Sequence, residues 1–214
     1  MAESGGKKDS EFKPPKPLTD SEIAQRANLF LNRHHPSRSL PIPIEQVVEF
    51  DLGLNIIPVP NLFRETGFDG FLSSDLREIT VDEFNMQYRI GRYHFTLAHE
   101  VAHKELHADL YRQFTFRTIA EWQEAVQGMG TELHDRLERE ANKFAGFVLV
   151  PAQMLATRFK ESIQTASKRG IKTISLSPQV LRYVSEFIAQ EFEVSPQVIE
   201  IRLREEKLFG MKKA

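Results

Sequence analysis

The sequence predicts an α+β fold in which a small, mostly antiparallel three-stranded sheet packs on one long helix, with further helices after it. Three observations carry this prediction. An apolar helical stretch contains the pattern His-Glu-x-x-His at residues 99–103. Just before it, between residues 54 and 82, the periodicity is that of strands. After it, helical segments broken at glycine and proline fill the rest of the chain.

Composition sets the class of protein. A chain of 214 residues can form one domain with a small extension and bury a core without disulfides. The formal net charge of −2 gives no overall attraction to nucleic acid or to a membrane. The chain has no cysteine, which excludes thiolate metal ligands and a cysteine nucleophile. No apolar run has the length of a membrane span or signal segment, so we expect a cytoplasmic protein without a membrane partner.

Capping and breaking residues define the N-terminal elements. Residues 1–17 are rich in Ser, Gly, Lys and Pro, which predicts a disordered arm. The capping box Thr19-Asp20-Ser21-Glu22 starts a helix that should run to about residue 33. A short helix over about residues 43–50 follows, and Gly53 ends it.

Three segments predict the sheet, over residues 54–59, 68–73 and 77–82. Pro58 cannot donate to a strand ladder, so the first segment should lie at an edge or end early. The connection between the other two segments is short, which predicts an antiparallel hairpin.

Helical periodicity resumes near residue 85 and should run through the motif to about residue 108. Later helices are expected over about 116–126, 132–150, 152–170, 178–192 and 196–207. We therefore divide the chain into an arm (1–17), a main domain (18–176) and an extension (177–214) that resembles a helix-turn-helix and packs on that domain.

The spacing within the motif has a chemical reason. His99 and His103 are four residues apart, so both imidazoles lie on one face of a helix and can bind one metal ion. Glu100 lies beside His99, and its carboxylate can accept a proton from an attacking water molecule. The remaining residues of the stretch are apolar, so the helix should be buried, where unpaired charge is costly. We therefore predict one zinc ion per chain, with Glu100 as the catalytic base.

A catalytic zinc site needs a third protein ligand. His107 lies ~12 Å of helical rise from His99, too far to share an ion with it on a straight helix. Asp109 would need a glycine at position 106 to turn the chain back, and Leu106 occupies that position. Both residues are expected at the surface or in a layer behind the ligands.

Two glutamates of a later helix remain as candidates. Glu138 and Asn142 are four residues apart and share a face. One helix can thus supply a ligand and an acceptor, Asn142 Oδ1, for the free N–H of a metal-bound imidazole. Glu140 points away from that face and has no such helper. We predict Glu138 as the third metal ligand.

Substrate contacts are predicted at the hairpin. An exposed strand edge can bind an extended backbone, and Gly70, followed by Phe71, leaves room for one. We therefore expect Gly70→Val to weaken cleavage more than folding. A donor to the tetrahedral oxyanion is also expected. The candidates are Tyr93, His94 and Tyr88, together with Tyr111 and His134.

The chain resembles a known family. The stretch 92–103, the block 138–146 and Val150-Pro151 resemble the ImmA/IrrE family of zinc metallo-endopeptidases, and the likeness covers roughly residues 20–208. It implies a zincin-like fold with zinc on the two motif histidines and Glu138, and Glu100 as the base. It also implies cleavage of a partner protein, commonly a helix-turn-helix repressor. The family often has glycine at the position of Ala102.

The predicted function is therefore a zinc endopeptidase that cuts a helix-turn-helix repressor and relieves repression, with the helices of 177–207 contacting the substrate. One alternative is a DNA-binding regulator with a structural zinc. Charges over residues 195–207 balance, so direct DNA binding is not expected. The other alternative is a catalytically silent module that binds its partner. Glu100 argues against both, because neither needs a base beside the metal.

Overall fold

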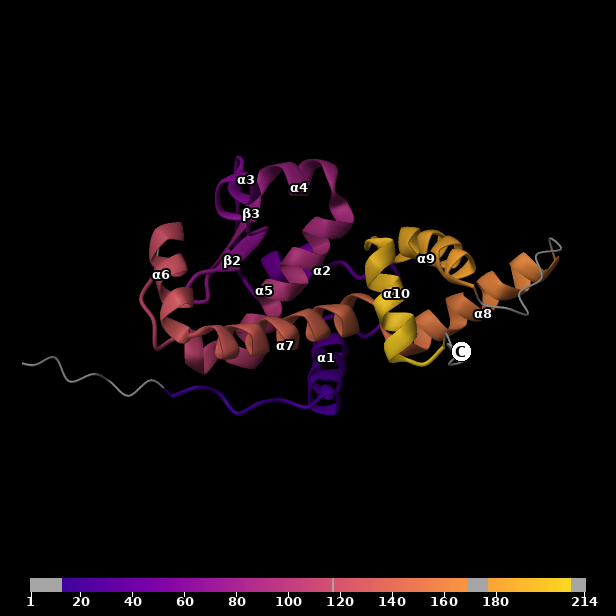
Figure 1. Ribbon diagram of the computed structural model, residues 1–214, viewed down its shortest axis with the longest axis horizontal. Coiled ribbons are helices and arrows are strands. Elements are labelled where there is room, and N and C mark those ends of the chain that lie inside the picture. Colours follow the sequence, from indigo (N-terminus) through magenta and orange to yellow (C-terminus); the bar gives the residue numbers. More distant parts are fainter. Residues whose placement is uncertain (1–12, 117, 169–176, 209–214) are drawn as a thin grey trace, which may run out of the picture.

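A computed structural model describes residues 13–116, 118–168 and 177–208, and these form an α+β fold (Figure 1). Most of the predicted disordered arm, the expected helix end near residue 170 and the last six residues lie outside the described ranges. Among the described residues, no helix combines the length and the apolar character that crossing a membrane requires.

The sheet consists of β1 (Asn55–Val59), β2 (Gly70–Leu72) and β3 (Glu78–Asp82), in the order β1-β3-β2. β2 and β3 form the predicted antiparallel hairpin, but β1 pairs with β3 in parallel. The sheet is therefore mixed, and the prediction of a mostly antiparallel sheet is wrong. The physical reason is the short helix α3 (Leu62–Thr66), after which the chain runs back as β2 and leaves the central position to β3. Pro58 lies in an edge strand, as predicted.

The motif helix is α5 (Ile90–Tyr111), and it is preceded by a separate helix, α4 (Glu83–Tyr88). We expected one continuous helix from about residue 85. Arg89 divides it, because its φ of −134° and ψ of 61° leave the helical region. Asp82 caps α4 through its carboxylate, which accepts from the backbone N–H of Asn85 at 2.9 Å.

Helices α1 (Asp20–His34) and α7 (Thr131–Leu149) complete the core around α5. α1 begins with the predicted capping box. α7 packs against both α5 and α1, and the rings of Phe30 and Phe144 meet edge to face at 5.7 Å. Figure 1 shows α7 running across the molecule from α6 (Ile119–Met129) to the C-terminal helices. Its apolar stripe is thus covered along its whole length.

The segment before β1 contains α2 (Ile44–Gln46) and a π-helical turn over Val47–Asp51, in place of the single short helix that we predicted. Ile44, Val47 and Val48 are buried there. The described end of the predicted arm, residues 13–17, has no regular structure but is held at two points. Gln113 bonds the backbone of Lys13, and Arg136 donates to the carbonyl of Pro15 at 2.7 Å.

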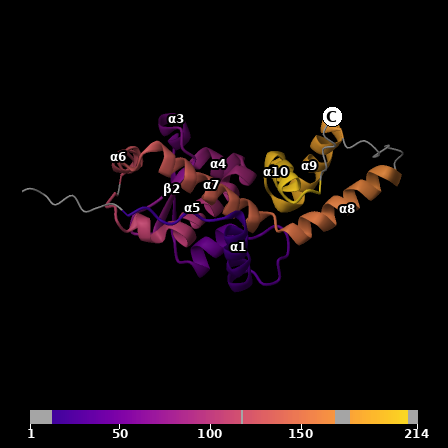
Figure 2. The same cartoon turned by 60° about the horizontal axis from the view of Figure 1, so that its bottom comes forward.

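The C-terminal helices are α8 (Ala152–Lys168), α9 (Pro178–Phe192) and α10 (Pro196–Glu205). Figures 1 and 2 show α8 extending away from the sheet, with α9 and α10 beside it. Arg202 of α10 is buried and fixes this helix to α7. Its guanidinium lies 4.3 Å from the ring centroid of Phe147 and donates to the carbonyl of Val150 at 3.4 Å. A Cβ at Gly146 would lie 3.1 Å from the Arg202 side chain, so glycine permits this close contact.

Candidate metal centre

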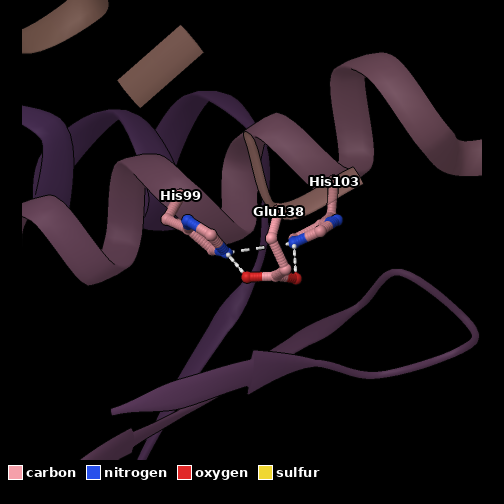
Figure 3. Close-up of side chains that lie close together, drawn as sticks. All are labelled: His99, His103 and Glu138. Carbon is pink, nitrogen blue, oxygen red and sulfur yellow. Dashed lines mark hydrogen bonds and ion pairs between the residues drawn. The ribbon is translucent and has the colours of Figure 1, made fainter. Parts of the chain in front are cut away.

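Three side chains converge in a cleft between the sheet, α5 and α7 (Figure 3). They are His99 and His103, from α5, and Glu138, from α7. Nε2 of His99 lies 3.1 Å from Glu138 Oε2, and Nε2 of His103 lies 3.3 Å from Glu138 Oε1. The two Nε2 atoms are 3.1 Å apart. Across the described ranges, no other group of three His, Asp or Glu side chains has donor atoms spaced for a metal ion.

Asn142 lies behind His99, one turn along α7 from Glu138. Its Oδ1 is 3.1 Å from Nδ1 of His99. Because an amide oxygen only accepts, Nδ1 of His99 donates to it, and Nε2 is the nitrogen that faces Glu138. The helix that supplies Glu138 therefore also orients one of the two histidines.

His107 and Glu140 form a second layer behind His103, and both are buried. Nδ1 of His103 is 3.1 Å from Nδ1 of His107, whose Nε2 is 3.1 Å from Glu140 Oε2. Glu140 points away from the face of Glu138 and Asn142, as the sequence predicts, but it bonds His107 there, a contact that we did not predict. The segment before α1 covers that side of α7 too, and the N–H of Leu18 donates to Glu140 Oε1 at 3.1 Å. The sequence allowed His107 a place in the layer behind the ligands, but we did not connect it with Glu140.

The other candidate ligand, Asp109, is at the surface. Its side chain is 97% exposed, and its only ion pair that joins the described residues is with Arg112 at 2.9 Å. Its position agrees with its exclusion from the ligand set.

Burial and neighbouring charges shift the pKa values of the titratable side chains in the cleft. Burial raises the pKa of the Glu100 carboxyl to about 7, against the opposing effects of His99 and of a hydrogen bond from the backbone N–H of Leu72. Burial lowers the pKa of His103 to about 4, although a hydrogen bond with Glu138 opposes the shift. For His99 the burial effect is outweighed by Glu138 and Glu100, and its pKa rises to about 9. The two histidines hold the pKa of Glu138 far below its usual range despite its burial.

These donors fit a divalent cation. One nitrogen each of His99 and His103 and one carboxylate oxygen of Glu138 lie within 4.8 Å of one another. Two imidazoles and one carboxylate are the protein ligands of a catalytic zinc site that keeps a further position open. Without a cation, one carboxylate would face two imidazole nitrogens of which at least one carries no proton.

The cleft has a volume of about 240 Å³ and an apolar wall opposite the metal ligands. Its aromatic side chains come from the loop before β2 and from the region around α6. Phe68 meets Trp122 edge to face at 4.4 Å, and Phe114 and Phe116 continue the wall. A second cavity of about 600 Å³ shares Asp69, Phe95 and Asn142 with the cleft and extends to Val198 and Ile201 of α10.

Gly70 borders the cleft, but for a different reason from the one predicted. An added Cβ would lie 2.6 Å from the carbonyl oxygen of Thr80 and 2.7 Å from Cγ2 of Thr96. The missing side chain therefore allows close packing within the sheet and onto α5, and Gly70→Val should damage folding as well as the cleft. Phe71 is buried and stacks on Trp122 at 5.5 Å, so it supports the wall from behind without lining the cleft.

The three preferred oxyanion donors do not reach the cleft. The hydroxyl of Tyr93 donates to Glu45 Oε1 at 2.8 Å inside the core. His94 is buried beside Glu193, with 3.5 Å between its Nδ1 and the carboxylate. Tyr88 is exposed on α4 and packs on Phe84. Each lies on a face of its helix that turns away from the metal ligands.

The other two candidates, Tyr111 and His134, do line the cleft. The ring centroid of Tyr111 is 5.3 Å from that of His103. Burial, together with the charges of Glu100 and Glu138, raises the pKa of Tyr111 well above its usual value, so its hydroxyl stays protonated and can donate. Nε2 of His134 is 3.8 Å from Glu138 Oε1.

Comparison with known proteins bears on the whole arrangement. No curated protein matches the chain. A solved structure described as a Mycobacterium tuberculosis transcriptional regulator is similar, with 13% identity and a TM-score of 0.49. The likeness covers 90% of this chain and 48% of that one, so this chain spans about half the length of that protein. The model of the IrrE N-terminal-like domain, Peptidase M78, matches residues 89–204, from the start of the motif helix into α10. The chain belongs to the IrrE N-terminal-like family.

Proposed function

We propose that this protein is a zincin-like, zinc-dependent endopeptidase that cleaves a partner protein in the cytoplasm. The observation that carries the proposal is the buried carboxylate of Glu100, which lies beside three converging metal donors and is not itself one of them. Bound zinc would acidify water and polarise the scissile carbonyl. Neither a structural metal site nor a silent binding module needs such a base.

Glu100 has two tasks in this mechanism. It takes a proton from the attacking water, and it then returns that proton to the amine that leaves when the peptide C–N bond breaks. A hydrogen bond from the backbone N–H of Leu72 helps to orient this carboxylate. Tyr111 and His134 are placed to donate to the oxyanion.

The edge of β2 supports binding of an extended backbone. Asp69 and Ser73 pair with β3, since Asp69 O accepts from Asp82 N at 2.8 Å and Ser73 N donates to Glu78 O at 2.9 Å. Because antiparallel pairing alternates, Gly70 and Leu72 between them present their backbone groups to the free edge. Leu72 already bonds Glu100, so Gly70 remains for a substrate strand. The apolar wall then receives a large apolar side chain of the substrate.

Residues far from the metal support a selective enzyme. The second cavity leads from the cleft to α10, where Val198 and Ile201 offer contacts to a folded partner. We propose a helix-turn-helix repressor as that partner, on the basis of the family resemblance. The C-terminal helices are poorly suited to DNA, because Arg202 is buried and paired with Glu205 and Glu206.

The proposal is tested with the zinc-loaded protein and the repressor encoded nearest to its gene. We expect two fragments of defined mass from wild type and none from Glu100→Gln. Many scattered cuts in unrelated proteins would indicate a general protease. Uncut repressor, together with salt-sensitive, sequence-specific DNA binding by this chain, would favour the regulator instead.

A further inference from the structure

A chain of hydrogen bonds leads from His103 away from the cleft into the protein. It runs from Nδ1 of His103 to Nδ1 of His107, from Nε2 of His107 to Glu140, and ends at the backbone N–H of Leu18. Each of these three bonds has a donor–acceptor distance of 3.1 Å. His107 and Glu140 are 1% and 5% exposed, so water does not compete for these bonds.

We propose that His107 and Glu140 are positioning residues, which hold His103 in the one tautomer that binds the metal and strengthen it as a ligand. The proposal rests on the fit of the three donors to a cation, but it does not require peptidase activity. A buried histidine–carboxylate pair is costly to keep merely for stability, since apolar residues of similar volume would serve.

The chain allows a single arrangement of protons once Nε2 of His103 gives its lone pair to a metal. Nδ1 of His103 then carries the proton and donates it to Nδ1 of His107. The proton of His107 must therefore lie on Nε2, where it is donated to the Glu140 carboxylate. Glu140 can only accept, and its other oxygen accepts from Leu18, so the direction of the whole chain is fixed.

The two metal-binding histidines are thus supported differently. His99 donates to a neutral amide, Asn142, near the mouth of the cleft. His103 donates through a neutral imidazole to a buried negative charge. A carboxylate behind a ligating imidazole raises its basicity, and loss of such support typically costs 10–100-fold in metal affinity.

Glu140→Gln tests the direction of the chain. The amide NH2 of glutamine can donate to Nε2 of His107, which would reverse every bond and place a proton on Nε2 of His103. We expect zinc affinity, measured by competition with a chromogenic chelator, to fall at least tenfold. Asp109→Asn, an equally conservative change on the exposed part of the motif helix, should leave the affinity unchanged.

His107→Phe keeps a ring in the core and removes both nitrogens, so it should lower zinc affinity to a similar extent. The double variant Glu140→Gln/His107→Phe should bind zinc no more weakly than the weaker single variant, because both act through one chain. In the double variant Glu140→Gln/Asn142→Ala, the fold-losses in zinc affinity of the two single variants should multiply, because the two residues act on different ligands. If the fold-losses in zinc affinity of Glu140→Gln and His107→Phe also multiply in their double variant, the proposal is overturned.

A direct readout needs no variant. Imidazole ¹⁵N NMR of the zinc-loaded wild type should show the proton of His103 on Nδ1 and that of His107 on Nε2. A proton on Nδ1 of His107 would contradict the proposal, as would wild-type zinc affinity in a folded Glu140→Gln. Circular dichroism of the metal-free variants separates unfolding from loss of the ligand. Tight zinc binding without cleavage by the wild type would contradict the proposed peptidase function alone and would leave these outcomes readable.

Discussion

The backbone N–H of Leu72, on the free edge of the sheet, donates a hydrogen bond to the carboxylate of Glu100 on the motif helix. The strand proposed to hold the substrate and the proposed catalytic base are therefore fixed to each other. Under the proposed function, a substrate strand aligned on Gly70 would meet the base in a set position.

The first prediction separates the base from the ligands. Glu100→Gln should keep zinc, because Glu100 is not a ligand, and should lower kcat by about 10²–10⁴-fold. His103→Ala should lose the metal itself. Metal content by atomic absorption, with kcat on the cleaved partner, distinguishes the two. Full turnover by Glu100→Gln would disprove the proposed mechanism.

The second prediction concerns the third ligand. Glu138→Ala should abolish tight zinc binding, and Asn142→Ala should weaken it about tenfold, because it only orients His99. Arg139→Ala, on the exposed face of the same helix, is the matched control. Glu140 is unsuitable as a control, since it lies behind His103. Equal zinc affinity in Glu138→Ala and Arg139→Ala would remove Glu138 from the ligand set.

The third prediction identifies the oxyanion donor. Tyr111→Phe should lower kcat about tenfold or more while KM and zinc content stay near wild type, because the hydroxyl would bond the transition state. Tyr93→Phe loses only a buried hydrogen bond to Glu45 and should cost about 1 kcal/mol of stability with unchanged kcat. If Tyr111→Phe has wild-type kcat, His134 is the remaining candidate that lines the cleft.

The fourth prediction concerns Gly70. Gly70→Ala should unfold at lower denaturant concentration, because its Cβ would collide with the Thr80 carbonyl oxygen and with Cγ2 of Thr96. Adding Thr96→Ser removes the second collision and should recover part of the loss relative to Thr96→Ser alone. Urea titrations of the four proteins measure this coupling. Independent effects of the two substitutions would show that the close approach is not the cause.

The fifth prediction is a pH dependence at His94. Burial lowers the pKa of His94, and the nearby Glu193 only partly offsets this. Below about pH 6.5 the unfolded chain takes up a proton that the folded chain resists, so stability falls as the pH decreases from there toward the folded pKa. His94→Gln should lose less stability than wild type between pH 7.5 and about 5.5. Denaturation of the metal-free proteins measures it, and parallel curves would contradict the assignment.

The sequence was informative where local rules act alone. The capping box of Thr19 and Glu22, the i, i+4 histidines and the pairing of Glu138 with Asn142 are all consequences of helix geometry, and the structure has each of them. They could be predicted because a helix fixes which residues share a face before any tertiary contact forms.

The errors arose where tertiary packing decides. Nothing local to residues 54–82 specifies that β3 lies between β1 and β2, so the parallel pair was missed. The partners of Glu140 were not predicted, because α7 is covered on more than one side, which its apolar stripe alone does not reveal. Tyr93, His94 and Tyr88 were named because their side chains can donate a hydrogen bond, whereas reaching the cleft depends on the rotation of α4 and α5.

Arg202 joins α10 to the carbonyl at the end of α7, the helix that carries Glu138 and Asn142. A ligand that orders one end of α7 also favours order at its other end. Thermodynamic linkage makes this effect mutual between the two binding sites. Metal binding should therefore raise the affinity for a partner docked on α10, and the docked partner should raise the affinity for the metal. Under the proposed function, a partner docked at α10 would bind more tightly to the zinc-loaded protein and would therefore be engaged preferentially in the state that can cut it.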